Sequence, residues 1–424
     1  MPTLFDPRTG LKVLLILCCA LAAATAAADD SPLSLGQAQD LAVARDNGRG
    51  ALVAEASAMR DRAVAAGELP DPEARIGATN VPVDSLALDR EDMTMIEVGI
   101  MQRFTTRRSR ELSRLQLEHH ALHYDAEAEL RRREVRLAVE RSWRELDYLD
   151  SAIALLDEAR NWTRVLIDGA AAAYESGAGS EAELLDARIG VLAIDEMLIE
   201  RRRDRETADA ELQRWIGMPA ASREAAPDPR RGLATLAALE AKLESHPMLR
   251  GLKHETGAAQ FEADLARERY KPAFGVDFGY GFRQGREMGG SGRSDMLSAM
   301  LTFDLPLFTR DRQDRELSAA RSMLRATEAR SDDARRVLAS RLATVHSSAT
   351  ALEQSLELYE SNMTPLVKSG VDASLAAYRA GDGSLAEVVA AQKRRLEAEQ
   401  RRLRLHADLG VALAEIESLT GAGT

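Results

Sequence analysis

The sequence predicts a mostly α-helical protein with a β part of the kind that crosses membranes. Three observations lead to this fold class. The 424 residues are 45% hydrophobic and 29% charged but only 4% aromatic, a mixture typical of long helices with repeated apolar seams. The chain also repeats one order of elements, a helix, an extended hairpin and two further helices. Each extended segment alternates over about ten residues, the length and pattern of a transmembrane barrel strand.

Charge and motif content exclude several classes of function. The formal net charge is −12 and the pI about 5.3, which disfavours a general nucleic-acid binder and a polybasic membrane-surface protein. Outside the N-terminus no stretch approaches the roughly 20 apolar residues of a spanning helix, so a helical inner-membrane transporter is excluded. Walker loops, His-Glu-x-x-His motifs and nucleophile elbows are absent from the sequence. We therefore predict that the protein is not an enzyme and that it has no catalytic residues and no cofactor.

Residues 1–28 are predicted to be an export signal. A positively charged start is followed by an apolar run over 11–24 and by three alanines. The only cysteines, Cys18 and Cys19, lie inside this segment, and Leu17 before them disfavours lipidation. We expect the mature chain to have no thiol, disulfide or thiolate metal site.

The rest of the chain is predicted to be a tandem duplication. The segment Ala-Ala-Tyr-Glu-Ser-Gly-Ala-Gly-Ser around Tyr174 returns 204 residues later as Ala-Ala-Tyr-Arg-Ala-Gly-Asp-Gly-Ser around Tyr378. A repeat at this spacing indicates two copies of one structural unit. We therefore divide the chain into a first repeat at 29–218, a linker at 219–232 and a second repeat at 233–424.

Each repeat is expected to open with a helix and to continue with two strands. The first helix begins at Ser34, where Ser-Leu-Gly-Gln is a capping box pattern. The apolar positions expected to continue along this helix are Leu41, Val53 and Val64. Period-2 alternation places the strands at about 73–81, 94–104, 273–283 and 295–308.

After each pair of strands, heptad spacing predicts an antiparallel coiled-coil hairpin. In the second repeat the first helix of this hairpin is expected to run from about 310 to 378, a length on the order of 100 Å. A kink is expected at Pro365. The heptad positions on the long helices are Leu338, Leu342, Val345, Leu352, Leu356, Tyr359 and Met363 in the second repeat, and Leu149, Ile153 and Leu156 in the first. On the returning helices they are Val389, Leu396 and Leu403, and Leu185, Ile189 and Leu192.

Four strands are too few to form a membrane structure alone. Lipid tolerates no open sheet edge, and membrane barrels start at about eight strands. If these strands cross a membrane, chains must assemble, with two chains giving eight strands and three giving twelve. This arithmetic does not choose between the two assemblies.

Several short motifs follow one another along both repeats. They are Leu-Pro-Asp-Pro at 69–72, Gln102 at the end of a strand, Phe-Asp-Leu-Pro-Leu-Phe at 303–308, and Tyr378-x-x-Gly-x-x-Ser-Leu-x-Glu-Val. In this order, and with the duplication, the whole mature chain resembles the TolC-type outer-membrane efflux proteins. The resemblance implies a homotrimer, with a twelve-stranded β-barrel in the outer membrane and a twelve-helix tunnel in the periplasm.

The same resemblance implies the function and the partners. It implies the exit duct of a tripartite efflux system in a Gram-negative-type cell, which meets a periplasmic adaptor, an inner-membrane RND-type pump and outer-membrane lipid, but no nucleic acid. The Asn-Val-Pro-Val-Asp segment at 80–84, with Met93-Thr94, resembles members of heavy-metal efflux systems, which makes heavy-metal cations a candidate substrate. The alternatives are a duct for drugs or type I protein secretion, and a soluble periplasmic coiled-coil scaffold. The four alternating segments favour the duct, because a scaffold does not need them.

The hairpin turns are the candidate docking sites for the adaptor. Their residues are Tyr174, Gly177, Gly179, Ser180, Tyr378, Gly381, Gly383 and Ser384. Glycine permits a tight reversal, and each turn ends in a Ser-x-x-Glu capping box pattern. The resemblance further implies an acidic pore constriction at the periplasmic end, drawn from Glu387, Asp186 and Glu183. The alternative is that Glu387 only caps its helix.

Two groups of residues raise the question of a metal site. His119 and His123 lie one helical turn apart, as paired ligands would, but a solvated helical face is the preferred interpretation. Met93, Met95 and Met101 are interpreted as apolar residues of a barrel strand rather than as ligands of a soft metal. We therefore predict no metal site.

Overall fold

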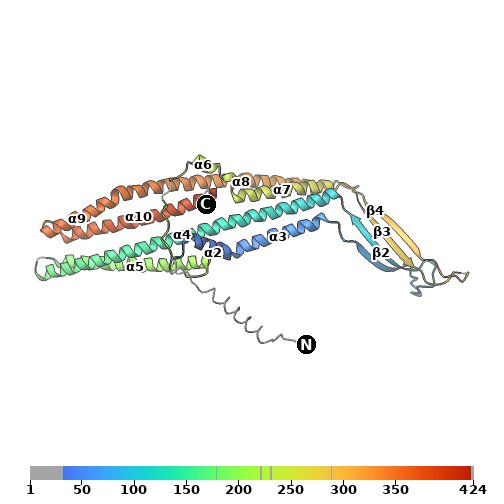
Figure 1. Ribbon diagram of the computed structural model, residues 1–424, viewed down its shortest axis with the longest axis horizontal. Helices are drawn as coiled ribbons and strands as arrows, with labels where there is room; N and C mark the ends of the chain where they lie inside the picture. Colours follow the sequence, from blue (N-terminus) through green and yellow to red (C-terminus); the bar gives the residue numbers. More distant parts are fainter. Residues whose placement is uncertain (1–31, 178, 220–221, 230–231, 288, 422–424) are drawn as a thin grey trace, which may run out of the picture.

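The computed structural model describes residues 32–177, 179–219, 222–229, 232–287 and 289–421. The expected export signal and its two cysteines lie outside these residues. The molecule is a long helical body with a sheet at one end (Figure 1). At the other end lie the two turns that connect helices into hairpins, called the helical turns below.

The elements follow the predicted order in both repeats. The first half contains α2 (Leu35–Arg45), α3 (Asn47–Gly67), β1 (Glu73–Thr79), β2 (Met95–Phe104), α4 (Arg107–Glu175) and α5 (Glu181–Ile216). The second half contains α6 (Leu236–Glu240), the short η2 (Leu243–Ser245), α7 (Pro247–Glu268), β3 (Ala273–Phe282), β4 (Met296–Asp304), α8 (Gln313–Leu358), the π-helical η3 (Tyr359–Met363), α9 (Thr364–Ala380) and α10 (Leu385–Thr420).

The opening helix of the first repeat differs from the prediction, because it consists of two helices. The capping box at Ser34 is present, but Asp46 ends α2 and caps α3 by accepting a hydrogen bond from the Arg49 N–H at 2.7 Å. Leu41, Val53 and Val64 are exposed, and the buried positions are Ala38, Ala42, Ala56 and Ala63. Alanine lets α3 approach α4 closely, so the larger residues point away from this contact.

The heptad pattern of the long helices is confirmed except at Met363, which is exposed. The pattern predicted for the returning helix α5 is wrong. Leu338, Leu342 and Leu356 are buried in one cluster that also holds Val345, Leu352 and Tyr359 at its edge. On α5, however, Leu185, Ile189 and Leu192 are exposed. The residues of α5 that face its own hairpin are Leu184, Ala187, Ile194 and Leu198. A second apolar stripe therefore runs along the outside of α5.

The long helix of the second repeat is interrupted where Pro365 predicts a kink. A π-helical turn at 359–363 separates α8 from α9. Proline has no N–H to donate, and its ring clashes with the carbonyl four residues earlier, here that of Ser361. The wider π turn accommodates both effects.

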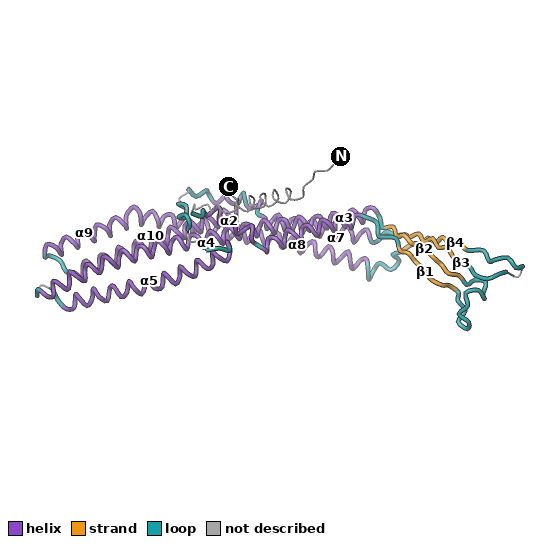
Figure 2. Tube along the Cα trace, turned by 60° about the horizontal axis from the view of Figure 1, so that its bottom comes forward, coloured by secondary structure: helices purple, strands orange, loops and turns teal. Residues whose placement is uncertain are grey.

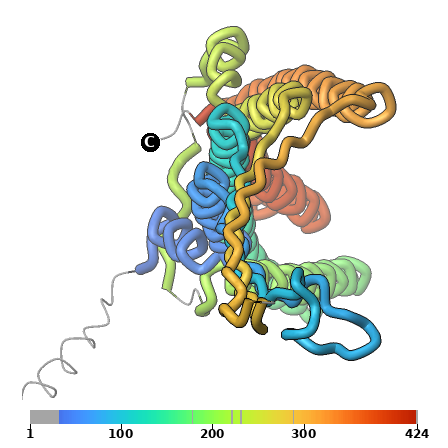
Figure 3. Tube along the Cα trace, turned by 90° about the vertical axis from the view of Figure 1, so that its right-hand side faces the viewer, coloured from blue at the N-terminus to red at the C-terminus, as the bar shows by residue number. Residues whose placement is uncertain are grey.

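The four strands form one antiparallel sheet in the order β1-β2-β3-β4. The β2–β3 pairing joins the two repeats, with Gly99 opposite Gly279. The sheet lies beyond the helices at one end of the molecule, and the helical turns lie at the other end (Figure 2). Viewed along the long axis, the helices of the second repeat lie mostly above those of the first (Figure 3).

Register gives the sheet one apolar and one polar face. Paired rows place the following residues on the apolar face: Ala74, Ile76, Ala78, Ile96, Val98, Ile100, Gln102, Phe104, Phe274, Val276, Phe278, Tyr280, Phe282, Leu297, Ala299, Leu301 and Phe303. All six charged residues of the strands lie on the other face. Met95 and Met101 are residues of β2, as interpreted from the sequence, and they lie on this polar face, whereas Met93 precedes the strand. This follows from the predicted alternation, which puts Met95 and Met101 on the side opposite to Ile96, Val98 and Ile100.

Candidate functional site

The turn between α4 and α5 is shaped by two glycines with different roles. Gly177 has a positive φ of 73°, a conformation that other residues adopt only with strain. Gly179 has no such φ, but a Cβ atom there would lie 3.1 Å from the Cβ of Ala173. Its N–H donates to the Ala173 carbonyl at 3.0 Å. The first glycine therefore reverses the chain, and the second lets it pack against α4.

The turn between α9 and α10 has the same construction. Gly381 has a φ of 81°, and a Cβ at Gly383 would lie 3.1 Å from that of Ala377. The two turns agree in the positive φ of the first glycine and in the close approach of the second glycine to the preceding helix. This agreement supports the duplication that the sequence predicts.

Both turns end in complete capping boxes. Ser180 Oγ accepts from the Glu183 N–H at 3.2 Å, and Glu183 accepts from the Ser180 N–H at 3.2 Å. Ser384 and Glu387 make the corresponding bonds at 3.2 and 3.1 Å. Each box satisfies amide groups that a helix start would otherwise leave unpaired.

The two turns pack against each other within one chain. Ala170 of α4, Leu184 of α5 and Leu385 of α10 form a buried cluster, with Tyr378 and Val389 at its edge. Tyr174 is 46% exposed. The structure thus brings the predicted docking residues to one end of the molecule as one surface.

The three carboxylates predicted for the constriction differ in their surroundings. One oxygen of Glu183 and one of Glu387 accept the capping bonds, and each carboxylate has a second oxygen that can meet solvent. Asp186 is exposed one turn into α5. The capping role of Glu387 is therefore present, and it is compatible with a charge that faces a pore.

His119 and His123 form a packed contact with α7, so their interpretation as part of a solvated helical face is wrong. His119 and His123 face α7, where their Nδ1 atoms lie 3.3 Å from the His254 carbonyl and 3.0 Å from the Gly251 carbonyl. A ring nitrogen that meets a carbonyl must donate, so Nδ1 carries the proton in both rings. No group of three or more His, Cys, Asp or Glu in the described part of the chain is arranged to hold a metal.

Burial also disfavours charge at this contact. It lowers the pKa of His120, with the nearby His123 acting in the same direction. It likewise lowers the pKa of His254, which the neighbouring His119 reinforces. The surroundings of His120 and His254 therefore favour their neutral forms.

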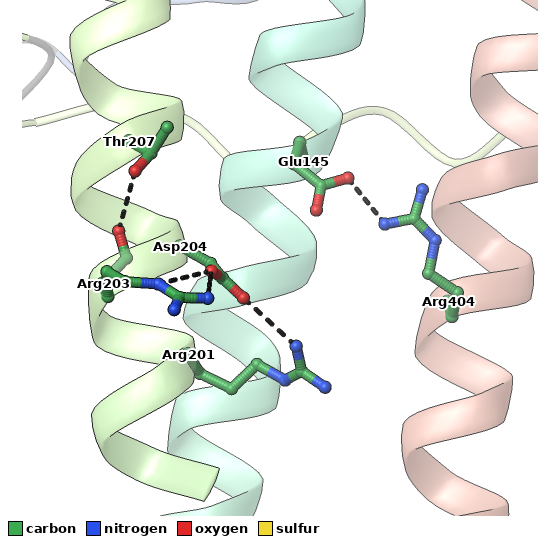
Figure 4. Close-up of polar contacts among 6 residues, drawn as sticks. All are labelled: Glu145, Arg201, Arg203, Asp204, Thr207 and Arg404. Atoms are coloured by element: carbon green, nitrogen blue, oxygen red, sulfur yellow. Dashed lines mark hydrogen bonds and ion pairs between the residues drawn. The ribbon is translucent and has the colours of Figure 1, made fainter.

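Charged contacts join the repeats farther along the helices. Arg404 of α10 bonds to Glu145 of α4 at 2.6 Å (Figure 4). The other ion pairs in this view stay within α5, where Asp204 lies 3.3 Å from Arg201 and 2.7 Å from Arg203. The Thr207 hydroxyl donates to the Arg203 carbonyl in the same helix.

One charged cluster was not identified from the sequence. On the polar face of the sheet, Arg75 of β1 lies between Glu97 of β2 and Asp277 of β3. Charges at alternating strand positions were an available signal. The contact between Arg75 and Asp277 depends on the pairing register of the strands. The sequence does not specify this register for residues that are 202 positions apart.

Among the helices that the structure describes, none has both the length and the apolar character needed to cross a membrane.

Comparisons with known proteins show which family model and which solved structures the chain resembles. Residues 238–422 match the family model described as outer membrane efflux protein. None of the curated proteins searched matches the sequence. Among solved structures, a membrane protein from Pseudomonas aeruginosa is 15% identical with a TM-score of 0.78, over 92% of this chain and 90% of that one.

Two further solved structures have similar folds. The outer membrane protein VceC from Vibrio cholerae is 15% identical with a TM-score of 0.76, over 91% of this chain and 96% of that one. CusC, whose structures concern transmembrane channel formation, is 14% identical with a TM-score of 0.78, over 92% of both chains.

The helical body and its four-stranded sheet thus define a protein with the fold of outer-membrane channels. The second repeat matches the outer membrane efflux protein family, and the predicted resemblance of the chain to the TolC-type members is confirmed.

Proposed function

We propose that the protein is the exit duct of a tripartite efflux system in the outer membrane. The observation that carries this proposal is the sheet, which has one apolar face and two unpaired edges, β1 and β4. A sheet with an apolar face and open edges is stable in lipid only when the edges close into a barrel. The strand count alone would allow two copies or three. The resemblance to the TolC-type proteins supports three copies with twelve strands, so the proposed assembly is a homotrimer.

Two further features support this assembly. The exposed stripe of Leu185, Ile189, Leu192 and Ile199 on α5 provides an apolar surface for a neighbouring copy. The helical turns lie at the end opposite the sheet (Figure 1). In the proposed duct they point into the periplasm, where the turn surface around Tyr174 and Tyr378 docks the adaptor and pump.

The first experiment tests location and assembly. Cells are fractionated, and the detergent-solubilised protein is expected in the outer membrane at roughly three times the mass of one mature chain. A bifunctional thiol reagent should join Ala78→Cys on β1 to Leu297→Cys on β4 between copies, whereas either single variant should give no covalent trimer. A soluble periplasmic monomer would contradict the duct and favour a coiled-coil scaffold.

Heavy-metal cations are the proposed substrate. The support is the segment at 80–84 with Met93 and Thr94, which resembles members of heavy-metal efflux systems. A strain lacking the protein should become sensitive to divalent metal salts but keep its resistance to lipophilic drugs. Loss of drug resistance alone would favour a drug duct instead.

A further inference from the structure

We propose that Arg75, Glu97 and Asp277 form an ion-selective charge ring inside the β-barrel, distinct from the carboxylates at the helical turns. The proposal rests on the proposed function, because three copies must close the barrel around a lumen. The cluster lies on the polar face of the sheet, and this face is the inner one when the apolar face meets lipid.

The three residues come from three adjacent strands. Arg75 Nη2 lies 2.9 Å from Asp277 Oδ1 and 3.1 Å from Glu97 Oε1. To reach Asp277 on β3, the Arg75 side chain crosses the whole of β2. The Asp277 side chain is only 7% exposed, whereas that of Arg75 is 52% exposed. The guanidinium therefore covers one carboxylate and remains accessible to passing ions.

Two facing glycines make room for this arrangement. Gly99 and Gly279 are paired in register, directly beside the charged residues. A Cβ at Gly99 would lie 3.3 Å from Arg75 Nη2, and one at Gly279 would lie 2.6 Å from Glu97 Oε1. Any larger residue at Gly279 would displace the carboxylate. The charged side chains therefore lie in a space that the backbone leaves open for them.

The residues directly opposite Asp277 are uncharged, and Arg103, the other guanidinium on this face of the described sheet, lies 3.8 Å from Glu73. In the strand register, Asp277 stands opposite Met101 on β2 and Met300 on β4. Thioethers are uncharged and are weak hydrogen-bond acceptors. Arg75 is the guanidinium that pairs with Asp277, so its removal takes away this counter-charge.

The polar face as a whole favours cations. The strands carry four carboxylates, Glu73, Glu97, Asp277 and Asp304, and two guanidinium groups, Arg75 and Arg103, so the net charge is −2 per chain. Rings of acidic side chains select cations in channels. Arg75 offsets one of the two negative charges at Glu97 and Asp277, and thereby limits the cation preference of the barrel.

The test compares reversal potentials of the purified trimer in a planar bilayer under a KCl gradient. Arg75→Gln should raise the potassium-to-chloride permeability ratio by about twofold or more, and the conservative Arg75→Lys should restore it toward the parent value. The Glu97→Gln, Asp277→Asn double variant should lower the ratio. The shifts should be larger near 0.01 M salt, where the screening length is about 30 Å, than near 0.1 M, where it is about 10 Å.

The outcomes separate this proposal from the proposed function. If no conducting trimer forms from the parent protein, the duct itself is wrong. If the parent conducts and all these variants keep its reversal potential at both salt concentrations, Arg75 only ties the strands together and the charge ring is wrong. Should Arg75→Gln fail to assemble, the double variant decides, because an unchanged ratio there also overturns the ring.

Discussion

The guanidinium of Arg404 lies 2.6 Å from the carboxylate of Glu145 and joins α10 of the second repeat to α4 of the first (Figure 4). Asp408, one turn farther along α10, accepts from the same guanidinium at 2.8 Å. Burial alone would lower the pKa of Arg404, but the hydrogen bonds to Asp408 and Glu145 outweigh it and raise the pKa. This residue therefore stays charged and links the two copies of the duplicated unit.

A double-mutant cycle measures this link. Glu145→Ala and Arg404→Ala should each lower the free energy of unfolding, with a coupling of about 1 kcal/mol, since both side chains are about one-third exposed. Thermal unfolding of the detergent-solubilised protein provides the measurement. Arg203→Ala is the matched control, because its pairing with Asp204 lies within α5 and is exposed. A coupling near zero would show that this ion pair does not contribute to holding the repeats together.

The helical turns should be sensitive to bulk at their glycines. Gly381→Val imposes a β-branched side chain on a positive φ, and Gly383→Val pushes against Ala377. We expect each variant to cost about 1–3 kcal/mol of local stability and to reduce efflux, while trimers still assemble. Resistance of exporting cells to substrate, with a parallel assay of assembly, measures both effects.

Gly370→Ala supplies the control for this prediction. It lies inside α9 with no atom within 4 Å of the added Cβ, so it should stabilise the helix by about 0.5–1 kcal/mol and leave efflux intact. Full resistance with both Gly381 and Gly383 replaced would contradict the docking assignment.

The constriction can be separated from the cap by changing charge without changing shape. Glu387→Gln keeps an oxygen that can accept the Ser384 N–H bond, and Asp186→Asn is similarly isosteric. If these carboxylates line the pore, the double variant should lose cation preference and block by multivalent cations in single-channel recordings.

Ser384→Ala removes the cap and keeps the charge. It removes the hydroxyl that accepts the Glu387 N–H and should cost about 1 kcal/mol of helix stability, but it keeps the carboxylate. We expect its selectivity to match that of the parent. Identical currents in the parent and in the Glu387→Gln, Asp186→Asn variant would leave Glu387 with its capping role alone.

Acid should destabilise the protein through His246. This residue is 4% exposed at the start of α7, and its Nδ1 accepts the Met248 N–H at 3.2 Å. Burial, reinforced by Arg133, Arg250 and Arg341, lowers its pKa to about 4. Because the unfolded chain binds the proton first, the stabilisation is complete above about pH 6.5 and is lost as pH falls toward 4, by on the order of 3 kcal/mol.

The His246→Asn variant tests this assignment. Asparagine can cap a helix but does not titrate in this range, so the fall in unfolding temperature between pH 7 and pH 4.5 should become smaller. The pKa values of His120 and His254 are also lowered in the folded protein. Their protonation should therefore also destabilise the fold, so part of the fall should remain. An unchanged pH profile would assign the acid sensitivity to other groups.

Much of the local structure could be predicted because it depends on short-range chemistry. The capping boxes at Ser180 and Ser384 are complete within four residues of sequence, and the positive φ at Gly177 and Gly381 follows from the need to reverse the chain. The interruption before Pro365 has a local cause as well. The predicted burial of Leu185 inside its own hairpin was wrong, because a heptad pattern does not show which of two neighbouring helices or chains covers a stripe.

The sequence by itself determined the duplicated order of helices and strands, the position of the turns and the alternation of the strands, since each follows from local periodicity or backbone chemistry. Only the tertiary structure decided which face each strand residue occupies and which distant residues meet. Arg75 contacts Asp277 through the pairing of β1, β2 and β3, and Arg404 contacts Glu145 through the packing of α10 against α4. The physical reason is that strand register and helix packing depend on the combined burial of many side chains, so residues more than 200 positions apart come together only in the folded chain.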